Sequence, residues 1–314
     1  MSLEPSLRKF ITRQTTLKGD AASDKHAAMS VIDPQLRIGR AEIAVSDLPR
    51  SVDFYGRVLG LPLRSFDDDT AAFGPDAERD SLLLRRLAHA QPAPPSATGL
   101  FHVAWLHPSR AGLAETARRI AAAGWPFDGA ADHGVSEALY LSDPDGLGVE
   151  IYADRPRELW QRPPEGQGVR MVTLALDVGD LLAQFEHDPA DVIAPGASIG
   201  HVHLKVAEVE RANAFYRDVL GFEEQARMPS AAFVSAGGYH HHIGLNSWQS
   251  RAGAPPPATA PGLRQVDFEL SDTAALDQLE RRLADGVGRV AARGDDGGLL
   301  VRDPDAQSLR FSTS

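Results

Sequence analysis

The chain has 314 residues, of which 43% are hydrophobic, and a formal net charge of −11. That length allows two domains or one larger assembly of repeats. The negative charge argues against nucleic acid or an anionic membrane as partner. The sequence has neither a signal-peptide core nor the roughly 20 apolar residues that span a bilayer, so we expect a cytoplasmic protein. With no cysteine, a metal would need His, Asp or Glu ligands.

Residues 1–36 are predicted to be a polar extension with little periodicity. The chain then repeats one pattern, first as IGRAEIAVSDLPRSVDFYGRVLGL (38–61) and again as IGHVHLKVAEVERANAFYRDVLGF (199–222). Alternating apolar residues predict a strand, and the following segment with Phe-Tyr and Val-Leu-Gly predicts a helix. Ser46 and Asp47, just before a proline, favour a helix start there.

Two diverged copies follow the same plan over residues 99–125 and 262–286. Ser109 and Ser271 are the predicted N-caps of their helices. Each copy closes with an Asp-Pro-Asp turn and a strand. The predicted order is therefore a strand, a helix and about three strands, four times over.

The DL-x-RS-x-x-FY-x-x-VLG pattern resembles the vicinal oxygen chelate superfamily of glyoxalases, bleomycin-resistance proteins and extradiol dioxygenases. The resemblance implies an α+β fold in which βαβββ modules pair, and each pair curls a sheet around a cleft. We place module 1 at 37–98, module 2 at 99–154, a connector at 155–198, module 3 at 199–250 and module 4 at 262–314. Many members keep this fold without a metal, so the ligands need their own evidence.

Metal ligands in this superfamily come from the first and last strands of each module. Aligning the repeats places four residues at one level of the first strands: Arg40, His102, His201 and Gln265. The matching position on the last strand is Glu150 in module 2 and Arg310 in module 4. A lone histidine in an apolar strand is more often a core residue, but His102, Glu150 and His201 together form the two-histidine, one-carboxylate set that suits Fe(II).

The three candidate ligands meet only if module 2 pairs with module 3. We therefore predict that modules 2 and 3 hold the metal and that modules 1 and 4 pair without one. Arg40 and Arg310 cannot act as ligands because a guanidinium only donates hydrogen bonds. They are expected to pair with acids such as Glu42, or to bind an anion.

The segment GGYHHHIGLN resembles the extradiol strand that carries the acid-base histidine, and its register assigns that role to His241. His203 and His242 are assigned to the substrate side. Tyr140 lies ten residues before the candidate glutamate, as the family's active-site tyrosine does, and His133 matches an upstream family histidine. The alternative is that the three consecutive histidines lie in a polar surface turn.

The HGVSEALYLSDPDGLGVEIYADRPRELW and YHHHIGLN stretches look most like bacterial four-module catechol-2,3-dioxygenases. That resemblance implies Fe(II), with Mn(II) as alternative, a small catechol or hydroquinone, and O2. Two rivals remain open: a glyoxalase-like metal-dependent lyase or isomerase, and a metal-free protein that sequesters a ligand. The oligomeric state also stays open, with a homo-oligomer as one possibility.

Overall fold

The computed structural model describes residues 31–75, 79–164, 168–185, 187–285 and 292–313. Most of the extension expected over residues 1–36 lies outside these ranges. Its last six residues pack on the body, where Ile32 and Leu36 are buried and the Ile32 amide donates to the Gly221 carbonyl.

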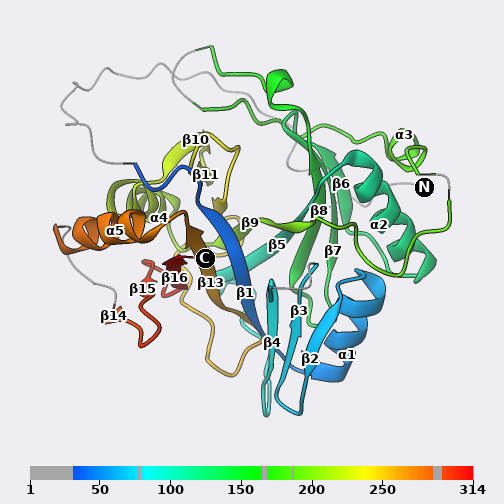
Figure 1. The fold of residues 1–314 in the computed structure, drawn as a ribbon, viewed down its shortest axis with the longest axis horizontal. Helices are drawn as coiled ribbons and strands as arrows, with labels where there is room; N and C mark the ends of the chain where they lie inside the picture. The colour runs from blue at the N-terminus through cyan, green and yellow to red at the C-terminus, as the bar shows by residue number, and fades with distance from the viewer. Residues whose placement is uncertain (1–30, 76–78, 165–167, 186, 286–291, 314) are drawn as a thin grey trace. The chain divides into compact units, whose positions relative to one another are not determined.

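The chain forms the strand–helix–three-strand unit four times, and Figure 1 shows the four units. The first contains β1 (Arg37–Val45), α1 (Leu48–Asp53), a π-helical turn η2 (Phe54–Val58), β2 (Leu63–Phe66), β3 (Thr70–Phe73) and β4 (Leu82–Arg86). The second contains β5 (Gly99–His107), α2 (Arg110–Ala122), β6 (Gly129–Asp132), β7 (Ser136–Ser142) and β8 (Gly148–Asp154).

The third unit contains β9 (Ser198–Lys205), α4 (Val209–Ala214), a π-helical turn η4 (Phe215–Leu220), β10 (Glu223–Met228), β11 (Ala231–Ser235) and β12 (Ile243–Asn246). The fourth contains β13 (Gly262–Leu270), α5 (Thr273–Asp285), β14 (Ala292–Arg293), β15 (Leu299–Arg302) and β16 (Ser308–Thr313). Between the second and third units lie a short 3₁₀ turn η3 (Arg157–Leu159) and α3 (Val178–Leu182). No helix within the described ranges is long and apolar enough to cross a membrane.

Two eight-stranded mixed sheets result, each built from two units. One has the order β14-β15-β16-β13-β1-β4-β3-β2, and the other has the order β10-β11-β12-β9-β5-β8-β7-β6. In each sheet the two first strands pair antiparallel at the centre, and each first strand pairs parallel with the last strand of its own unit. The predicted α+β fold with two paired-module sheets is confirmed.

Helix N-caps follow the local sequence with one correction. The Asp47 carboxylate accepts from the Arg50 amide, and the Ser109 hydroxyl accepts from the Gly112 amide, as expected of capping residues. Ser271 is not the cap of α5. Its neighbour Asp272 accepts from the Ala275 amide instead, so the prediction was wrong by one residue.

The Asp-Pro-Asp turns join the two sheets. The hydroxyl of Tyr55, in the first unit, donates to Asp143 in the turn of the second unit at 3.1 Å. The hydroxyl of Tyr216, in the third unit, donates to Asp303 in the turn of the fourth at 3.0 Å. The Phe-Tyr motif of the sequence is thus a contact between units of different sheets, which makes residues 31–314 one interlocked body.

Candidate metal centre

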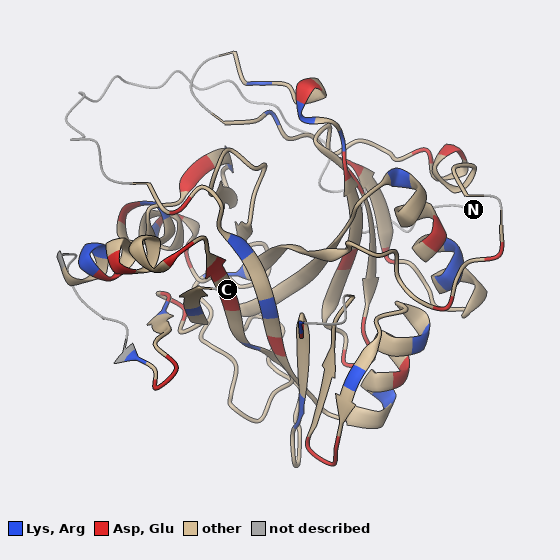
Figure 2. Ribbon diagram, in the orientation of Figure 1, with Lys and Arg blue, Asp and Glu red and all other residues tan. Residues whose placement is uncertain are grey.

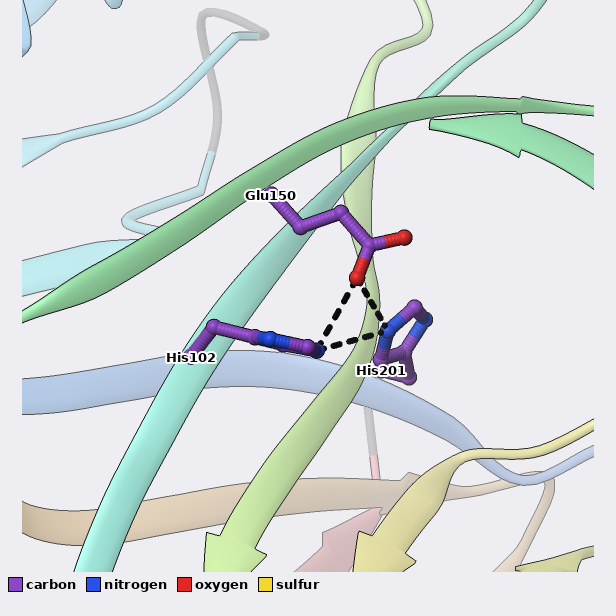
Figure 3. Close-up of side chains that lie close together, drawn as sticks. All are labelled: His102, Glu150 and His201. Atoms are coloured by element: carbon purple, nitrogen blue, oxygen red, sulfur yellow. Dashed lines mark hydrogen bonds and ion pairs between the residues drawn. The ribbon is translucent and has the colours of Figure 1, made fainter. Parts of the chain in front are cut away.

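Three adjacent strands at the centre of one sheet carry His102, Glu150 and His201. Ala104 of β5 is opposite Glu150 of β8 and opposite His201 of β9, so the side chains project from neighbouring positions. Figure 3 shows the three groups pointing toward one another. The His102 Nε2 atom lies 2.9 Å from Glu150 Oε2 and 3.3 Å from His201 Nε2, and the last two groups are 3.2 Å apart.

A glycine makes room for this arrangement. An added Cβ at Gly200 would lie 1.8 Å from the Tyr152 hydroxyl oxygen, so a larger residue cannot occupy this position without moving the tyrosine. The ring of Tyr152 in turn lies 4.9 Å from the ring of His201. Close backbone approach at this point therefore fixes the position of one candidate ligand.

The three groups have the chemistry that a divalent cation requires. All are at most 5% exposed, and burial lowers the pKa of His201 to about 4, which keeps its imidazole neutral. Burial would raise the pKa of Glu150, but the imidazoles of His201 and His102 hold it well below its usual range. An ionised carboxylate and two imidazoles, removed from water and without a cation, would be an unfavourable arrangement.

The distances also fit a single ion. Two ligands at about 2.1 Å from an ion and at right angles to each other are roughly 3 Å apart. The three observed separations, 2.9–3.3 Å, match that value. Among the described residues, these are the group of three His, Asp or Glu side chains whose ligand atoms converge closely enough for one metal. The chain therefore has a His-Glu-His metal site.

Tyr140 and His133 lie on one flank of this site. Tyr140 pairs with Glu150 across β7 and β8, and its ring lies 5.8 Å from that of His102. Burial, together with the Glu150 carboxylate, raises the pKa of Tyr140 well above its usual value. The Tyr140 hydroxyl and His133 Nε2 are 2.7 Å apart, while His133 Nδ1 is 2.8 Å from the Val172 carbonyl.

The carbonyl fixes the direction of these hydrogen bonds. It can only accept, so Nδ1 of His133 donates and, in the neutral ring, Nε2 accepts from the Tyr140 hydroxyl. The lone pairs of the tyrosine oxygen stay available to the site. The chain segment between the second and third units thus reaches the metal centre through Val172.

His241 lies on the opposite flank. Its ring centroid is 4.0 Å from that of His201, and burial lowers its pKa well below the usual value. A chain of contacts leads from it to a partly exposed carboxylate: His241 Nδ1 is 2.7 Å from His240 Nδ1, and His240 Nε2 is 2.9 Å from Asp154 Oδ1. Because the carboxylate accepts, a neutral His240 accepts in turn from His241, which leaves Nε2 of His241 with its lone pair free.

The two remaining predicted site residues, His203 and His242, lie in different surroundings. The His203 ring lies 4.9 Å from that of His102 and contacts the aromatic rings of Phe101 and Trp248, at 5.1 and 5.6 Å. His242 instead accepts from the Ala236 amide through Nδ1. The histidine run is therefore buried, and the alternative of a polar surface turn is wrong.

The equivalent positions of the other sheet carry different groups. Arg40 pairs with Asp267 at 2.8 Å, and Arg310 pairs with Asp296 at 2.5 Å. Both arginines thus bind acids, but Glu42 was the wrong partner, since it pairs with Arg85. This sheet contributes no group of three His, Asp or Glu side chains that could hold a metal, as far as the described residues show.

Sequence reasoning missed two members of the site, Asp154 and the role of His240. A signal was present, because side chains alternate along a strand and Glu150, Tyr152 and Asp154 share one face of β8. It also missed Phe101, which is the extra residue of a β-bulge between β5 and β9 and so stands beside His102. A bulge is not visible in one sequence.

Comparison with known proteins agrees with this site. The profile of the Glyoxalase/Bleomycin resistance protein/Dioxygenase superfamily matches residues 37–151 and 198–309. The chain belongs to this superfamily.

Individual relatives of the chain are also similar to it, one in sequence and two in fold. The chain is 43% identical over 259 residues to a Catechol-2,3-dioxygenase of Bacillus subtilis (strain 168), which covers 81% of this chain and 90% of the relative. Among solved structures, a Bacillus subtilis subsp. subtilis str. 168 protein matches with a TM-score of 0.59 at 17% identity, covering 90% of this chain and 86% of its own. Glyoxalase I of Zea mays matches with a TM-score of 0.53 at 16% identity, covering 89% and 92%. At these identities the two structures support the fold alone.

Proposed function

We propose that this protein is an extradiol dioxygenase that inserts both atoms of O2 into a catechol-type ring, breaking the carbon–carbon bond beside the diol. The observation that carries the proposal is the buried triad of His102, Glu150 and His201. The 43% identity to a protein named Catechol-2,3-dioxygenase supports it. We propose Fe(II) as the metal, with Mn(II) as the alternative, because this ligand set leaves coordination positions open.

When bound, the metal supplies a place where the diol and O2 can meet and a path for electrons between them. The protein residues supply positioning and proton transfer. The free Nε2 of His241 is proposed to accept a proton from the diol and to return it when the ring opens. A neutral imidazole is required for the first step, and burial keeps His241 neutral. His240 and Asp154 hold the ring in the tautomer that leaves Nε2 free.

Tyr140 is proposed to hold the second oxygen of the diol. Its own proton is directed to His133, so the phenol oxygen can accept a hydrogen bond from a substrate hydroxyl. His203, Phe101 and Trp248 are proposed to contact the ring, since their side chains gather beside His102. His242 is not proposed to contact the ring, because its Nδ1 already accepts a hydrogen bond from the Ala236 amide.

The module assignment is also a proposal. The sheet that bears the triad contains strands from residues 99–154 and 199–250, and the other contains strands from 37–98 and 262–314. This supports a metal-binding pair of modules 2 and 3, a metal-free pair of modules 1 and 4, and a connector at 155–198. The glyoxalase alternative would favour another carboxylate from the partner module, but Gly244 holds that position.

The test is to purify the protein without air, measure its bound metal and follow O2 uptake with catechol. We expect one iron per chain, one O2 consumed per catechol and a yellow ring-opened product. Protein with its metal that consumes no O2 on any catechol or hydroquinone would contradict the proposal. If the same protein isomerised a thiohemiacetal, the lyase or isomerase alternative would replace it.

A further inference from the structure

One strand face leads from the metal site toward solvent. His201, His203 and Lys205 alternate along β9 on one face, and the residues between them, Val202 and Leu204, are fully buried in the core on the other. The metal ligand thus begins a row that ends in a half-buried lysine.

The neighbouring strand β12 extends this face. Gly244 pairs with His203 and Asn246 pairs with Lys205 in a parallel register, so these residues point to the same side. An added Cβ on Gly244 would lie 2.8 Å from the ring of His203, which shows that the imidazole leans over this glycine. The absence of a side chain at residue 244 therefore lets the His203 ring lie against the backbone of β12.

On this face of β9 and β12, three buried polar atoms have no hydrogen-bond partner among the described residues: Nδ1 of the candidate metal ligand His201, His203 Nε2 and Asn246 Nδ2. The orientation of the amide is fixed, since Asn246 Oδ1 accepts from the Trp248 amide. Nδ2 is therefore a donor that faces away from the backbone. A buried donor without a partner is costly, so this amide is available to a bound group that accepts hydrogen bonds.

Lys205 adds a positive charge to these donors. It is the one lysine in residues 31–314, a stretch otherwise rich in arginine. Over the described part of the chain no acid lies within ion-pair distance of its ammonium group, and burial lowers its pKa. A lysine commonly buries its stem while its ammonium group stays in water, so the absence of a counter-ion leaves the charge of Lys205 available to a ligand.

The row has a length and a lining that suit an aromatic ligand. Four residues of a strand span roughly 13 Å, which accommodates a ring and a short side chain between the metal and the lysine. Phe101 and Trp248 lie beside His203, with ring centroids 5.1 and 5.6 Å from it, and Phe233 lies at 5.8 Å. These aromatic side chains offer apolar faces to a ring.

We infer that Lys205, Asn246 and His203 form a recognition site for a carboxylate on the side chain of the aromatic substrate. The inference rests on the proposed ring-cleavage function and narrows its substrate class to catechols that carry an acid. A carboxylate only accepts hydrogen bonds, so it matches the Lys205 ammonium group, the Asn246 amide and His203 in the tautomer that carries its proton on Nε2. A ring without an acid would leave the two buried groups, His203 Nε2 and Asn246 Nδ2, without a partner and Lys205 without a counter-ion.

The test compares ligands that differ only in the acid. Calorimetry without oxygen measures ligand binding to the metal-loaded protein. The ligands are 2,3- and 3,4-dihydroxyphenylacetate, their methyl esters and catechol. We expect at least one acid to bind about ten- to a hundredfold more tightly than its ester, the difference that charge-assisted hydrogen bonds give. Lys205→Met should remove most of this preference and leave catechol binding within about twofold. Lys205→Arg should restore part of it.

A matched control is Arg251→Met, which removes an exposed positive charge beside Ala252, whose amide donates to the Ala207 carbonyl just after β9; it should change no affinity. If acid and ester bind equally to the unmodified protein while catechol is still cleaved, the inference is wrong and the proposed function stands. If no ring is cleaved, the proposed function fails. The acid–ester difference in binding then still decides the inference, because calorimetry requires no turnover.

Discussion

The two sheets are built alike but differ in the groups that occupy equivalent positions. In one sheet these positions hold His102, Glu150 and His201, all buried and facing one another. In the other they hold Arg40, Gln265 and Arg310. Figure 2 shows this contrast along the first strands, since β1 carries charges of both signs and β5 carries none.

The difference shows how one fold separates support from chemistry. The arginine sheet neutralises its charges internally: Arg40 and Gln265 both bind Asp267, and Arg310 binds Asp296. In the histidine sheet, the lone pairs of His102, Glu150 and His201 face one another, and a bound cation would neutralise the carboxylate and accept all three. The backbone fixes where the groups stand, and the side chains decide whether the cleft binds a metal.

The largest effect is expected from Glu150→Ala. Removing the carboxylate leaves only two imidazole ligands and no negative charge, so a divalent ion binds much more weakly, and metal content and O2 uptake should fall to background. Elemental analysis and an oxygen electrode measure both quantities. The matched change in the other sheet, Arg310→Ala, should leave metal content unchanged. Retention of a full metal complement by Glu150→Ala would show that the ion binds elsewhere.

The second change, His241→Phe, should leave the metal bound because the triad is untouched. Turnover should fall by roughly 10²–10⁴-fold, the usual contribution of a positioned acid-base group. Steady-state kinetics at saturating catechol and oxygen measure it. His242→Phe is the control from the same histidine run, and it should retain far more activity. The reverse ranking would mean that His242 is the proton-transfer residue.

A smaller loss is expected from Tyr140→Phe. The change leaves the substrate hydroxyl without its acceptor, which costs on the order of 1–3 kcal/mol for a buried group, or about five- to a hundredfold in kcat/KM. Metal content should be unaffected. His133→Gln offers a comparison, because it keeps a polar group beside the tyrosine. Wild-type kcat/KM for Tyr140→Phe would exclude a role for this hydroxyl.

Much of this arrangement could be predicted from the sequence because it depends on repetition. The four copies gave the α+β fold with its paired-module sheets, and aligning their first strands brought His102 and His201 to one level. The same alternation of side chains extends to Asp154 on β8 and Lys205 on β9, so both lay within reach of the same reasoning.

Other features depend on the folded chain. Arg40 pairs with Asp267 rather than with Glu42. The reason is that β1 and β13 pair antiparallel and place Arg40 opposite Asp267. The approach of Val172 to His133 comes from a connector that has no repeat pattern. Such contacts join residues far apart in the sequence, and spacing alone cannot predict them.

The smallest effect concerns the two Asp-Pro-Asp turns that join the sheets. Burial raises the pKa of Asp143 and of Asp303 to about 6, although each accepts two backbone amides and a tyrosine hydroxyl. A carboxyl whose pKa is raised by folding stabilises the protein while it is protonated in both states, below about pH 4. That stabilisation is lost as the pH rises through about 6, where the folded-state group ionises.

Asp303→Asn isolates this contribution, because an amide stays neutral and its oxygen can still accept the two backbone amides. The free energy of unfolding of the wild type, minus that of the variant, should fall by on the order of 1–2 kcal/mol between pH 4 and 7. Denaturant unfolding at each pH measures it. Glu158→Gln, at an exposed position, should show a smaller change or none. If this difference in unfolding free energy stays constant or rises with pH, Asp303 is not protonated in the folded protein at mildly acidic pH. An ionised carboxylate would then hold Tyr216 and the turn together.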